Sequence, residues 1–441
     1  MNRWTANVVV VLTFSLPLTA NLGLSDERVT KSGDSINVPT ATEQRRLQLP
    51  DPPFRYADSD NDTDNGAAAL PQHVRAVAQA FDNTPPENPI TDAGATLGRV
   101  LFYDKSLSVN GTVSCASCHQ QDKAFTDGQP TSPGFDGRRG KRNSMSLINL
   151  RYYRPGRMFW DERASSLEDQ VLRPIEDPIE MGHQLSVLIN QIQQDPIYPP
   201  LFDAAFGETT VTKDRIAQAL AQFVRSIVSF ASPYDEGRAA VASIYDDFPN
   251  FTEQQNLGKQ MFLTRGGCAI CHLAPDEFLH RSPRSGQATL ISDTAAQTSA
   301  SAELLTDLAP DDVIADRQSA FFFVEGPTVN GIDGDPAASD PGVGQVSGLE
   351  QDRGAFKVSS LRNIEVTGPY MHDGRFTTID RVLEHYNWSV RPHPNLDPRL
   401  QEAVKGIALP EKEKVALAEF LKTLTDRSVL TDVRFSDPFV R

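Results

Sequence analysis

The hydrophobic pattern of this chain is mainly helical. Val74, Val77 and Phe81 recur at the spacing that one face of an α-helix presents, and they predict a first helix that begins near Gln72. The segment from about 410 to 425 again carries its apolar residues on one face. Stretches in which polar and apolar residues alternate are few. We therefore predict an all-α fold with long connecting loops.

A short pattern occurs twice in the chain. Residues Leu97–Phe102 read LGRVLF, and residues Leu257–Phe262 read LGKQMF. Thr252 and Gln255 have the spacing of a capping box, in which two side chains bond the first free backbone N–H groups, and they predict the start of the second helix. The repeat predicts two related helical domains, each with a short helix leading into a loop.

The remaining composition sets the boundaries of these domains. A positively charged start and an apolar run too short to span a bilayer predict a signal peptide over residues 1–23. An acidic, proline-containing leader, expected to be disordered, follows over 24–71. The two domains then span 72–245 and 246–441, and a loop insertion rich in Ser, Thr, Ala and Asp is expected at about 281–325 of the second.

All four cysteines of the chain lie in two C-x-x-C-H motifs. The motif residues are Cys115, Cys118 and His119 in the first, and Cys268, Cys271 and His272 in the second. This is the attachment signature of c-type haem, in which two thiols bond one porphyrin and the histidine ligates the iron. A zinc site or a pair of disulfides would not explain a histidine directly after each cysteine pair. We therefore predict two covalently bound c-type haems, one in each domain.

The charge of the chain narrows the choice of partners. The formal net charge is −16, which argues against a nucleic acid or an anionic membrane surface as partner. A signal peptide together with covalent haem indicates the periplasm, without a stable membrane span after cleavage. A soluble redox protein, such as a cytochrome c or a cupredoxin, remains a suitable partner.

Several strings of the chain have the order of a known family. They include LGRVLFYDKSLSVNGTVSCASCH, RNSMSLIN, MFWDERASSLEDQ, PIEDPIEMG, FKVSSLRN and TGPYMHDGRFTTIDRVLEHY. From about residue 88 to 425 the sequence resembles the bacterial diheme cytochrome c peroxidase superfamily, and within it the MauG-like subtype. The resemblance implies two cytochrome c-type haem domains, of which the first is peroxidatic and the second transfers electrons.

The resemblance also implies roles for single residues. His119 and His272 would be the proximal iron ligands, and Trp160 would carry charge between the haems. Gln170 would lie in the pocket where peroxide binds, and Glu180 would be the catalytic acid and base, although Glu176 is close in sequence. A carboxylate suits this role because cleavage of the O–O bond needs a proton moved from one oxygen to the other.

Two departures from the family's peroxidases define the subtype. No histidine occurs between His119 and His183, so the first haem is expected to be open and five-coordinate without prior reduction. Tyr386 lies fourteen residues after His372, where MauG-like members have a tyrosine that ligates the second iron. An anionic phenolate lowers the reduction potential of haem iron. His385 and Met371 remain alternative ligands.

The family further binds one calcium ion between the haem domains. Asn143, Thr367 and Pro369 would supply its protein oxygens, and water would complete the shell. His372 is expected to bond near the edge of a haem. A homodimer is also compatible with the family.

The expected function is periplasmic reduction of hydrogen peroxide to water with electrons from a donor protein. One alternative is a MauG-like enzyme that oxidises side chains of a partner protein. The other is a diheme electron-transfer protein that does not turn over peroxide.

Overall fold

The computed structural model describes residues 46–57, 70–272, 320, 322, 326–334 and 340–440. Its longer helices are α1 (Gln72–Phe81), α2 (Asp92–Tyr103), α6 (Leu185–Gln194), α7 (Tyr198–Phe206), α8 (Lys213–Ser226), α9 (Pro233–Ala239), α10 (Glu253–Leu263) and α16 (Glu411–Lys422). Its shorter helices are α3 (Cys115–Cys118), α4 (Leu167–Gln170), α5 (Arg173–Glu176), α11 (Cys268–His272), α14 (Gly344–Ser347), α15 (Ile379–Glu384) and the π-helix His385–Ser389. Two-residue strands β1 (Arg46–Leu47) and β2 (Phe439–Val440) are the only strands among the described residues.

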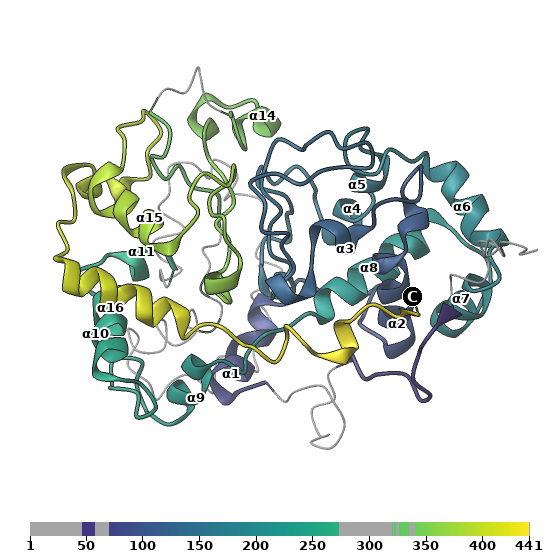
Figure 1. Ribbon diagram of the computed structural model, residues 1–441, viewed down its shortest axis with the longest axis horizontal. Helices are drawn as coiled ribbons and strands as arrows, with labels where there is room; N and C mark the ends of the chain where they lie inside the picture. Colours follow the sequence, from purple (N-terminus) through teal and green to yellow (C-terminus); the bar gives the residue numbers. More distant parts are fainter. Residues whose placement is uncertain are drawn as a thin grey trace, which may run out of the picture. The chain divides into compact units, whose positions relative to one another are not determined.

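Helices α2 and α8 pack side by side (Figure 1). Thr91 begins α2, and its hydroxyl accepts a hydrogen bond from the N–H of Gly94 at 3.0 Å. The contact between the two helices depends on Gly98, where an added Cβ would lie 2.0 Å from the carbonyl oxygen of Ala219. Only a residue without a side chain allows the backbones to approach this closely.

Helices α10 and α16 repeat this arrangement elsewhere in the chain (Figure 1). The predicted capping box is present, since Thr252 and Gln255 bond each other's backbone N–H groups at 2.9 and 3.2 Å. An added Cβ on Gly258 would lie 1.9 Å from the carbonyl oxygen of Ala416. The two similar hexapeptides therefore lie in helices that form equivalent pairs with α8 and α16.

The loops beyond the helix pairs repeat as well. An isolated bridge pairs Met158 with Ala164, and another pairs Tyr370 with Phe376. In both loops the residue after the first bridge position has a positive φ, which is 70° at Phe159 and 75° at Met371. Non-glycine residues seldom adopt this conformation. The second half of the chain therefore copies the first in its loops as well as in its helices.

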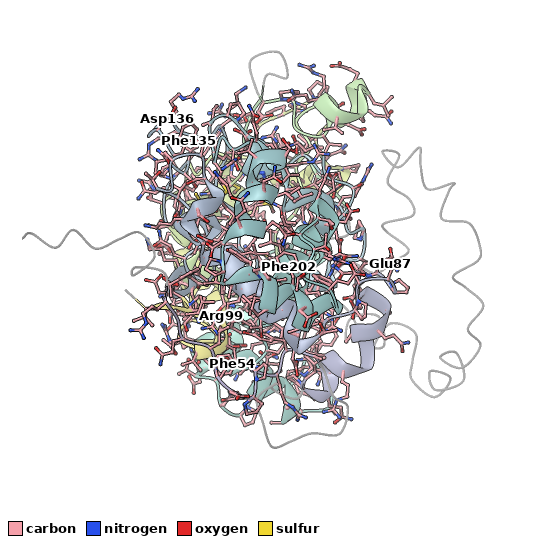
Figure 2. All side chains as sticks on the ribbon, turned by 90° about the vertical axis from the view of Figure 1, so that its right-hand side faces the viewer. Phe54, Glu87, Arg99, Phe135, Asp136 and Phe202 are labelled. Atoms are coloured by element: carbon pink, nitrogen blue, oxygen red, sulfur yellow. The ribbon has the colours of Figure 1, made fainter. Side chains whose placement is uncertain are left out.

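The end of the chain packs against the first helix pair. Phe435 belongs to the hydrophobic cluster around α2 and α8, and its carbonyl accepts a hydrogen bond from Tyr103 Oη at 2.6 Å. Arg99 Nε donates to the carbonyl of Ser436 at 2.6 Å, and its guanidinium lies 5.3 Å from the ring centroid of Phe54 (Figure 2). Pairing of β1 with β2 fixes the last residues to the first described ones.

The prediction of an all-α fold is confirmed. A second hydrophobic cluster surrounds α10 and α16, but the described residues from Arg46 onward belong to one compact unit, and the division near residue 245 stays a prediction. Part of the expected leader is ordered, because Tyr56 is buried and its backbone N–H bonds Asp92 at 2.7 Å. The expected signal peptide and, apart from residues 320 and 322, the insertion lie outside the described residues. No helix in the described ranges is long and apolar enough to cross a bilayer.

Candidate functional site: two haem attachment motifs and their surroundings

Each C-x-x-C-H motif forms one short helix, α3 or α11. In α3 the backbone N–H of Ser114 donates to Ser117 Oγ at 2.9 Å, which completes a capping box at the start of the helix. All four cysteines lie within the described residues, and none forms a disulfide. Both motifs therefore present two unbridged thiols and the histidine from one helical turn, as covalent attachment of a porphyrin needs.

His119 is held so that one ring nitrogen remains for a metal. Its Nδ1 lies 2.8 Å from the carbonyl oxygen of Phe125, and Ser144 Oγ lies 3.3 Å away on the same side. Burial lowers the pKa of His119, although the Phe125 carbonyl opposes this shift. The neutral ring donates its Nδ1 proton to the carbonyl, so the lone pair of Nε2 points to the other side.

The second motif has the same geometry. His272 Nδ1 lies 3.1 Å from the carbonyl oxygen of Phe322, and burial lowers the pKa of His272 to about 4. Phe125 and Phe322 both have a left-handed backbone, with φ of 61° and 55°. The carbonyl comes six residues after the histidine in the first motif and fifty in the second. Two neutral, oriented imidazoles next to cysteine pairs fit two c-type haems.

Glu180 lies close to the first cysteine pair. Burial is the main cause that raises the pKa of the Cys115 and Cys118 thiols, and the charge of Glu180 adds to it in both cases. Burial and the charge of Asp177 raise the pKa of Glu180 itself to about 7, against an opposing effect of Arg163. A carboxyl group of this pKa can both accept and donate a proton near neutral pH.

Backbone contacts hold the Glu180 segment against the loop at Gly134 and Phe135. The carbonyl of Glu180 accepts a hydrogen bond from Phe135 N–H at 2.9 Å. An added Cβ on Gly134 would lie 1.6 Å from the carbonyl oxygen of Ile179, so the backbones of the two segments are in direct contact there. Glu176, the other acid considered from sequence, is exposed on α5. The structure thus separates the two candidates by burial.

Trp160 is joined through Asn143 to the segment around His372. Its Nε1 donates to the carbonyl oxygen of Asn143 at 2.8 Å, and the N–H of Asn143 donates to the carbonyl of His372 at 2.7 Å. The ring of His372 stacks on Phe356, with 3.7 Å between ring centroids. A continuous chain of contacts therefore runs from Trp160 to the loop of the second site. Gln170 is half-buried at the end of α4.

The three candidate ligands of the second haem converge on one residue, Asn330. His385 Nε2 lies 3.0 Å from the carbonyl oxygen of Asn330, and the side-chain Nδ2 of Asn330 donates to Met371 Sδ at 3.4 Å. Burial raises the pKa of Tyr386, the charges of Cys271 and Cys268 add to this, and a hydrogen bond with Asn330 opposes it. Asn330 therefore contacts all three candidates, and Tyr386 lies near the second cysteine pair.

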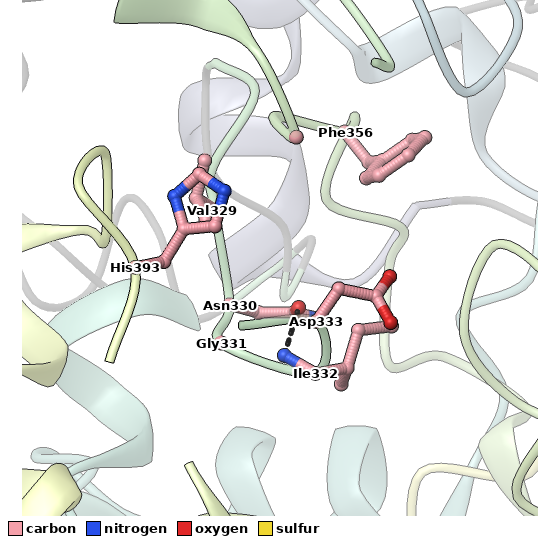
Figure 3. Close-up of a pocket in the computed structure, with 8 residues that line it drawn as sticks. Val329, Asn330, Gly331, Ile332, Asp333, Phe356 and His393 are labelled. Carbon is pink, nitrogen blue, oxygen red and sulfur yellow. Dashed lines mark hydrogen bonds between the residues drawn. The ribbon is translucent and has the colours of Figure 1, made fainter. Parts of the chain in front are cut away.

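Asn330 also lines a small pocket beside this site, together with Phe356 and His393 (Figure 3). Its Oδ1 accepts a hydrogen bond from Ile332 N–H at 3.3 Å. The sequence carried no signal for Asn330, because it lies 41 residues before Met371 and 55 before His385. Only the folded chain brings these residues together.

Among the residues expected to bind calcium, Asn143 bonds His372, which is close in sequence to Thr367 and Pro369. The bond from Asn143 to the carbonyl of His372 places Asn143 beside the segment that begins at Thr367 and Pro369. Asn143 Nδ2 donates to the carbonyl of Gln129 at 2.8 Å. Asn143 and Pro369 are both buried, so their oxygens are shielded from bulk water.

Comparisons with known proteins agree with this geometry. The model of the di-haem cytochrome c peroxidase family matches residues 92–240. The methylamine utilization protein MauG of Paracoccus denitrificans is 31% identical over 389 residues, covering 77% of this chain and 90% of the relative. Cytochrome c551 peroxidase of Nitrosomonas europaea is 29% identical over 331 residues, covering 75% and 79%. A solved structure of a MauG-like protein associated with microbial copper homeostasis has a TM-score of 0.63 at 29% identity, covering 81% of this chain and 96% of that one.

The chain belongs to the di-haem cytochrome c peroxidase family, in its MauG-like branch. It is accordingly an oxidoreductase that acts on peroxide and carries two haems. The predictions of the family, the fold class and the two haems are confirmed.

Proposed function

We propose that this protein reduces hydrogen peroxide to water in the periplasm, with electrons from a soluble donor protein such as a cytochrome c or a cupredoxin. The observation that carries the proposal is Glu180, a shielded carboxyl group with a pKa of about 7 beside the first cysteine pair. An electron-transfer protein without peroxide turnover would have no need for such a group.

In this proposal His119 and His272 would each hold one haem iron, and their Nδ1 bonds to backbone carbonyls increase the basicity of Nε2. When bound, the first haem supplies the iron at which the O–O bond of peroxide is cleaved. No histidine follows His119 until His183, whose Nε2 lies 2.9 Å from Gln191 Oε1. This engagement supports an open peroxide site that needs no prior reduction.

Glu180 moves the proton in the cleavage. Its carboxylate accepts the proton from one peroxide oxygen and then gives it to the other, the leaving oxygen, which departs as water. Gln170 holds the peroxide in position with its amide. Because burial and the charge of Asp177 raise the pKa of this half-buried carboxyl group to about 7, it can accept and donate a proton near neutral pH.

Trp160 carries electrons between the two sites, along its bond to Asn143 and onward to His372. At the second site Tyr386 is the proposed iron ligand, because it is half-buried and lies near Cys268 and Cys271. One calcium ion bound by Asn143, Thr367 and Pro369 would hold this connection in place. A homodimer is compatible with the proposal.

Tyr386 also supports a second candidate function, oxidation of side chains in a partner protein. Axial ligands set haem potentials over roughly 0.8 V, and a phenolate lies at the low end, where an oxidising equivalent is stored rather than an electron supplied. This chemistry suits a slow protein substrate.

The proposal is tested by mixing the purified holoprotein with peroxide and a reduced small cytochrome c or cupredoxin. We expect two donors to be oxidised per peroxide. Oxidation of neither donor, together with oxidation of tryptophan or tyrosine in an added protein, would favour the second function. No reaction of the haems with peroxide would contradict both functions.

A further inference from the structure

A buried tyrosine is paired with a buried carboxylate next to Trp160. The hydroxyl of Tyr153 donates a hydrogen bond to Glu162 Oε1, and the two residues are only 1% and 6% exposed. Glu162 comes two residues after Trp160 and has a φ of 55°, which a residue with a side chain seldom adopts. A strained backbone is kept where the surrounding structure requires the side chain in that place.

A buried lysine completes the cluster. Lys357 Nζ lies 3.6 Å from the ring centroid of Tyr153, and its backbone N–H donates to the carbonyl oxygen of Trp160 at 2.8 Å. Nζ also bonds the carbonyl of Arg157 at 3.3 Å and lies 3.7 Å from Met158 Sδ. Lysine and glutamate are seldom buried without a function or a partner. The cluster is therefore linked to Trp160 on two sides, by Glu162 along the chain and by Lys357 across it.

The arrangement suits oxidation of a phenol coupled to loss of its proton. Oxidising tyrosine makes its hydroxyl strongly acidic, so the reaction needs a base already bonded to that hydroxyl. Glu162 meets this need, and burial raises its pKa despite the opposing effects of Tyr153 and Lys357, which makes it a better proton acceptor. Burial lowers the pKa of Lys357 to about 7, against the opposing charge of Glu162, and whenever its Nζ is protonated the charge over the ring disfavours a positively charged radical, so that loss of the electron without the proton is suppressed.

We propose that Tyr153 is a redox-active residue that holds one oxidising equivalent beyond Trp160. This inference rests on the proposed function, because hydrogen peroxide supplies the oxidising equivalents. One electron passes from Tyr153 to oxidised Trp160, which returns to its closed-shell form. The O–H bond of Tyr153 breaks, and its proton forms an O–H bond on Glu162 Oε1. A neutral tyrosine radical and a neutral carboxylic acid remain. An electron from the donor protein and the returning proton restore both groups.

An oxidising equivalent stored on Tyr153 matters when the electron-donor protein is scarce. Each peroxide brings two oxidising equivalents, and storage of one on a buried tyrosine keeps it away from the porphyrin. The radical is shielded from water, which favours a long lifetime. Met158 Sδ lies 3.7 Å from Lys357 Nζ and is an oxidisable side chain of the same cluster.

The experiment is electron paramagnetic resonance of the holoprotein, frozen at intervals after one equivalent of peroxide without donor. We expect a tyrosine radical in the wild type, narrowed when the protein is made with ring-deuterated tyrosine. Tyr153→Phe should lower its yield at least tenfold while the haem absorbance still responds to peroxide. Glu162→Gln, which keeps the hydrogen-bond acceptor but not the base, should do the same.

Tyr103→Phe is the matched control. Tyr103 is also buried, but it donates to the backbone carbonyl of Phe435, which cannot take a proton. This variant should keep the radical. An unchanged tyrosine radical in Tyr153→Phe overturns the inference, as does a wild type that reacts with peroxide and forms no tyrosine radical. Haems that do not respond to peroxide overturn the proposed function as well.

Discussion

Replacement of Glu180 by glutamine removes the group that we propose moves the proton. Glutamine keeps the size of the side chain and one of its oxygens, but its amide does not gain or lose a proton near neutral pH. General acid and base catalysis contributes about 10²–10⁴-fold in rate. This factor corresponds to about 3–5 kcal/mol of activation free energy. We therefore expect the rate constant for peroxide cleavage to decrease by about 10²–10⁴-fold.

The Glu180→Gln variant should also lose the pH dependence of the rate of peroxide cleavage. Burial and the charge of Asp177 raise the pKa of Glu180 to about 7, so the carboxylate that accepts the first proton forms as the pH rises through that value. The wild-type rate should therefore rise with pH and level off above about 7. In Glu180→Gln it should not change with pH in this range.

The assay is rapid mixing of the ferric protein with excess peroxide, followed by haem absorbance from pH 5 to 9. Glu176→Gln is the matched control, because Glu176 is an exposed acid on α5. Its rate should equal that of the wild type. The reasoning is refuted if Glu180→Gln, with both haems attached, reacts at the wild-type rate, or if Glu176→Gln is slowed as much.

Three further predictions concern the ligand, the helix contact and a buried ion pair. Tyr386→Phe should raise the reduction potential of the second haem, measured by spectroelectrochemistry, because the phenolate is lost; an unchanged potential would mean that another group ligates the iron. Gly98→Ala should lower the free energy of unfolding of the holoprotein by about 1–3 kcal/mol, because the new Cβ would lie 2.0 Å from a carbonyl oxygen, while Gly140→Ala, with no atom within 4 Å, should be neutral. Asp235→Asn should cost about 3–5 kcal/mol at neutral pH, since it leaves Arg362, 2.6 Å from the carboxylate, buried without its partner. Arg362 lowers the pKa of Asp235 against the effect of burial, so this difference in stability should hold above about pH 4 and shrink as the acid is protonated at lower pH; a constant difference down to pH 2 would argue against the ion pair.

The haem attachment residues could be predicted from the sequence because the chemistry of attachment needs them adjacent. Cys115, Cys118 and His119 occupy one helical turn, and no distant residue is required to recognise them. The two similar hexapeptides likewise predicted a repeated structure, because their residues are adjacent in sequence. Gly98 and Gly258 each allow a close contact between helices, and the residue type alone indicates a place where a side chain would not fit.

Contacts between distant segments could not be predicted in this way. The carbonyl that orients His272 comes from Phe322, across the expected insertion, although its counterpart for His119 is six residues away. Asn330 is an ordinary asparagine in sequence and becomes significant only because His385 and Met371 fold onto it. Hydrogen bonds of this kind depend on tertiary packing, and neither periodicity nor a motif encodes them.

Burial is the other property that the sequence did not supply. Glu176 and Glu180 are equivalent as residue types, and the structure separates them because only the second is shielded beside the cysteine pair. Lys357 and Glu162 likewise look like surface charges in the sequence, yet both are buried around Tyr153. The positions of charged groups near the haem sites therefore follow from the fold alone.

The central claim, an open first haem that reacts with peroxide through Glu180, is tested most directly by rapid mixing of the fully ferric protein with one equivalent of peroxide. We predict an immediate change of the haem absorbance without any reductant. If the absorbance changes only after one haem has been reduced, an additional ligand closes the first site, and the assignment to an enzyme that needs no reductive activation is contradicted.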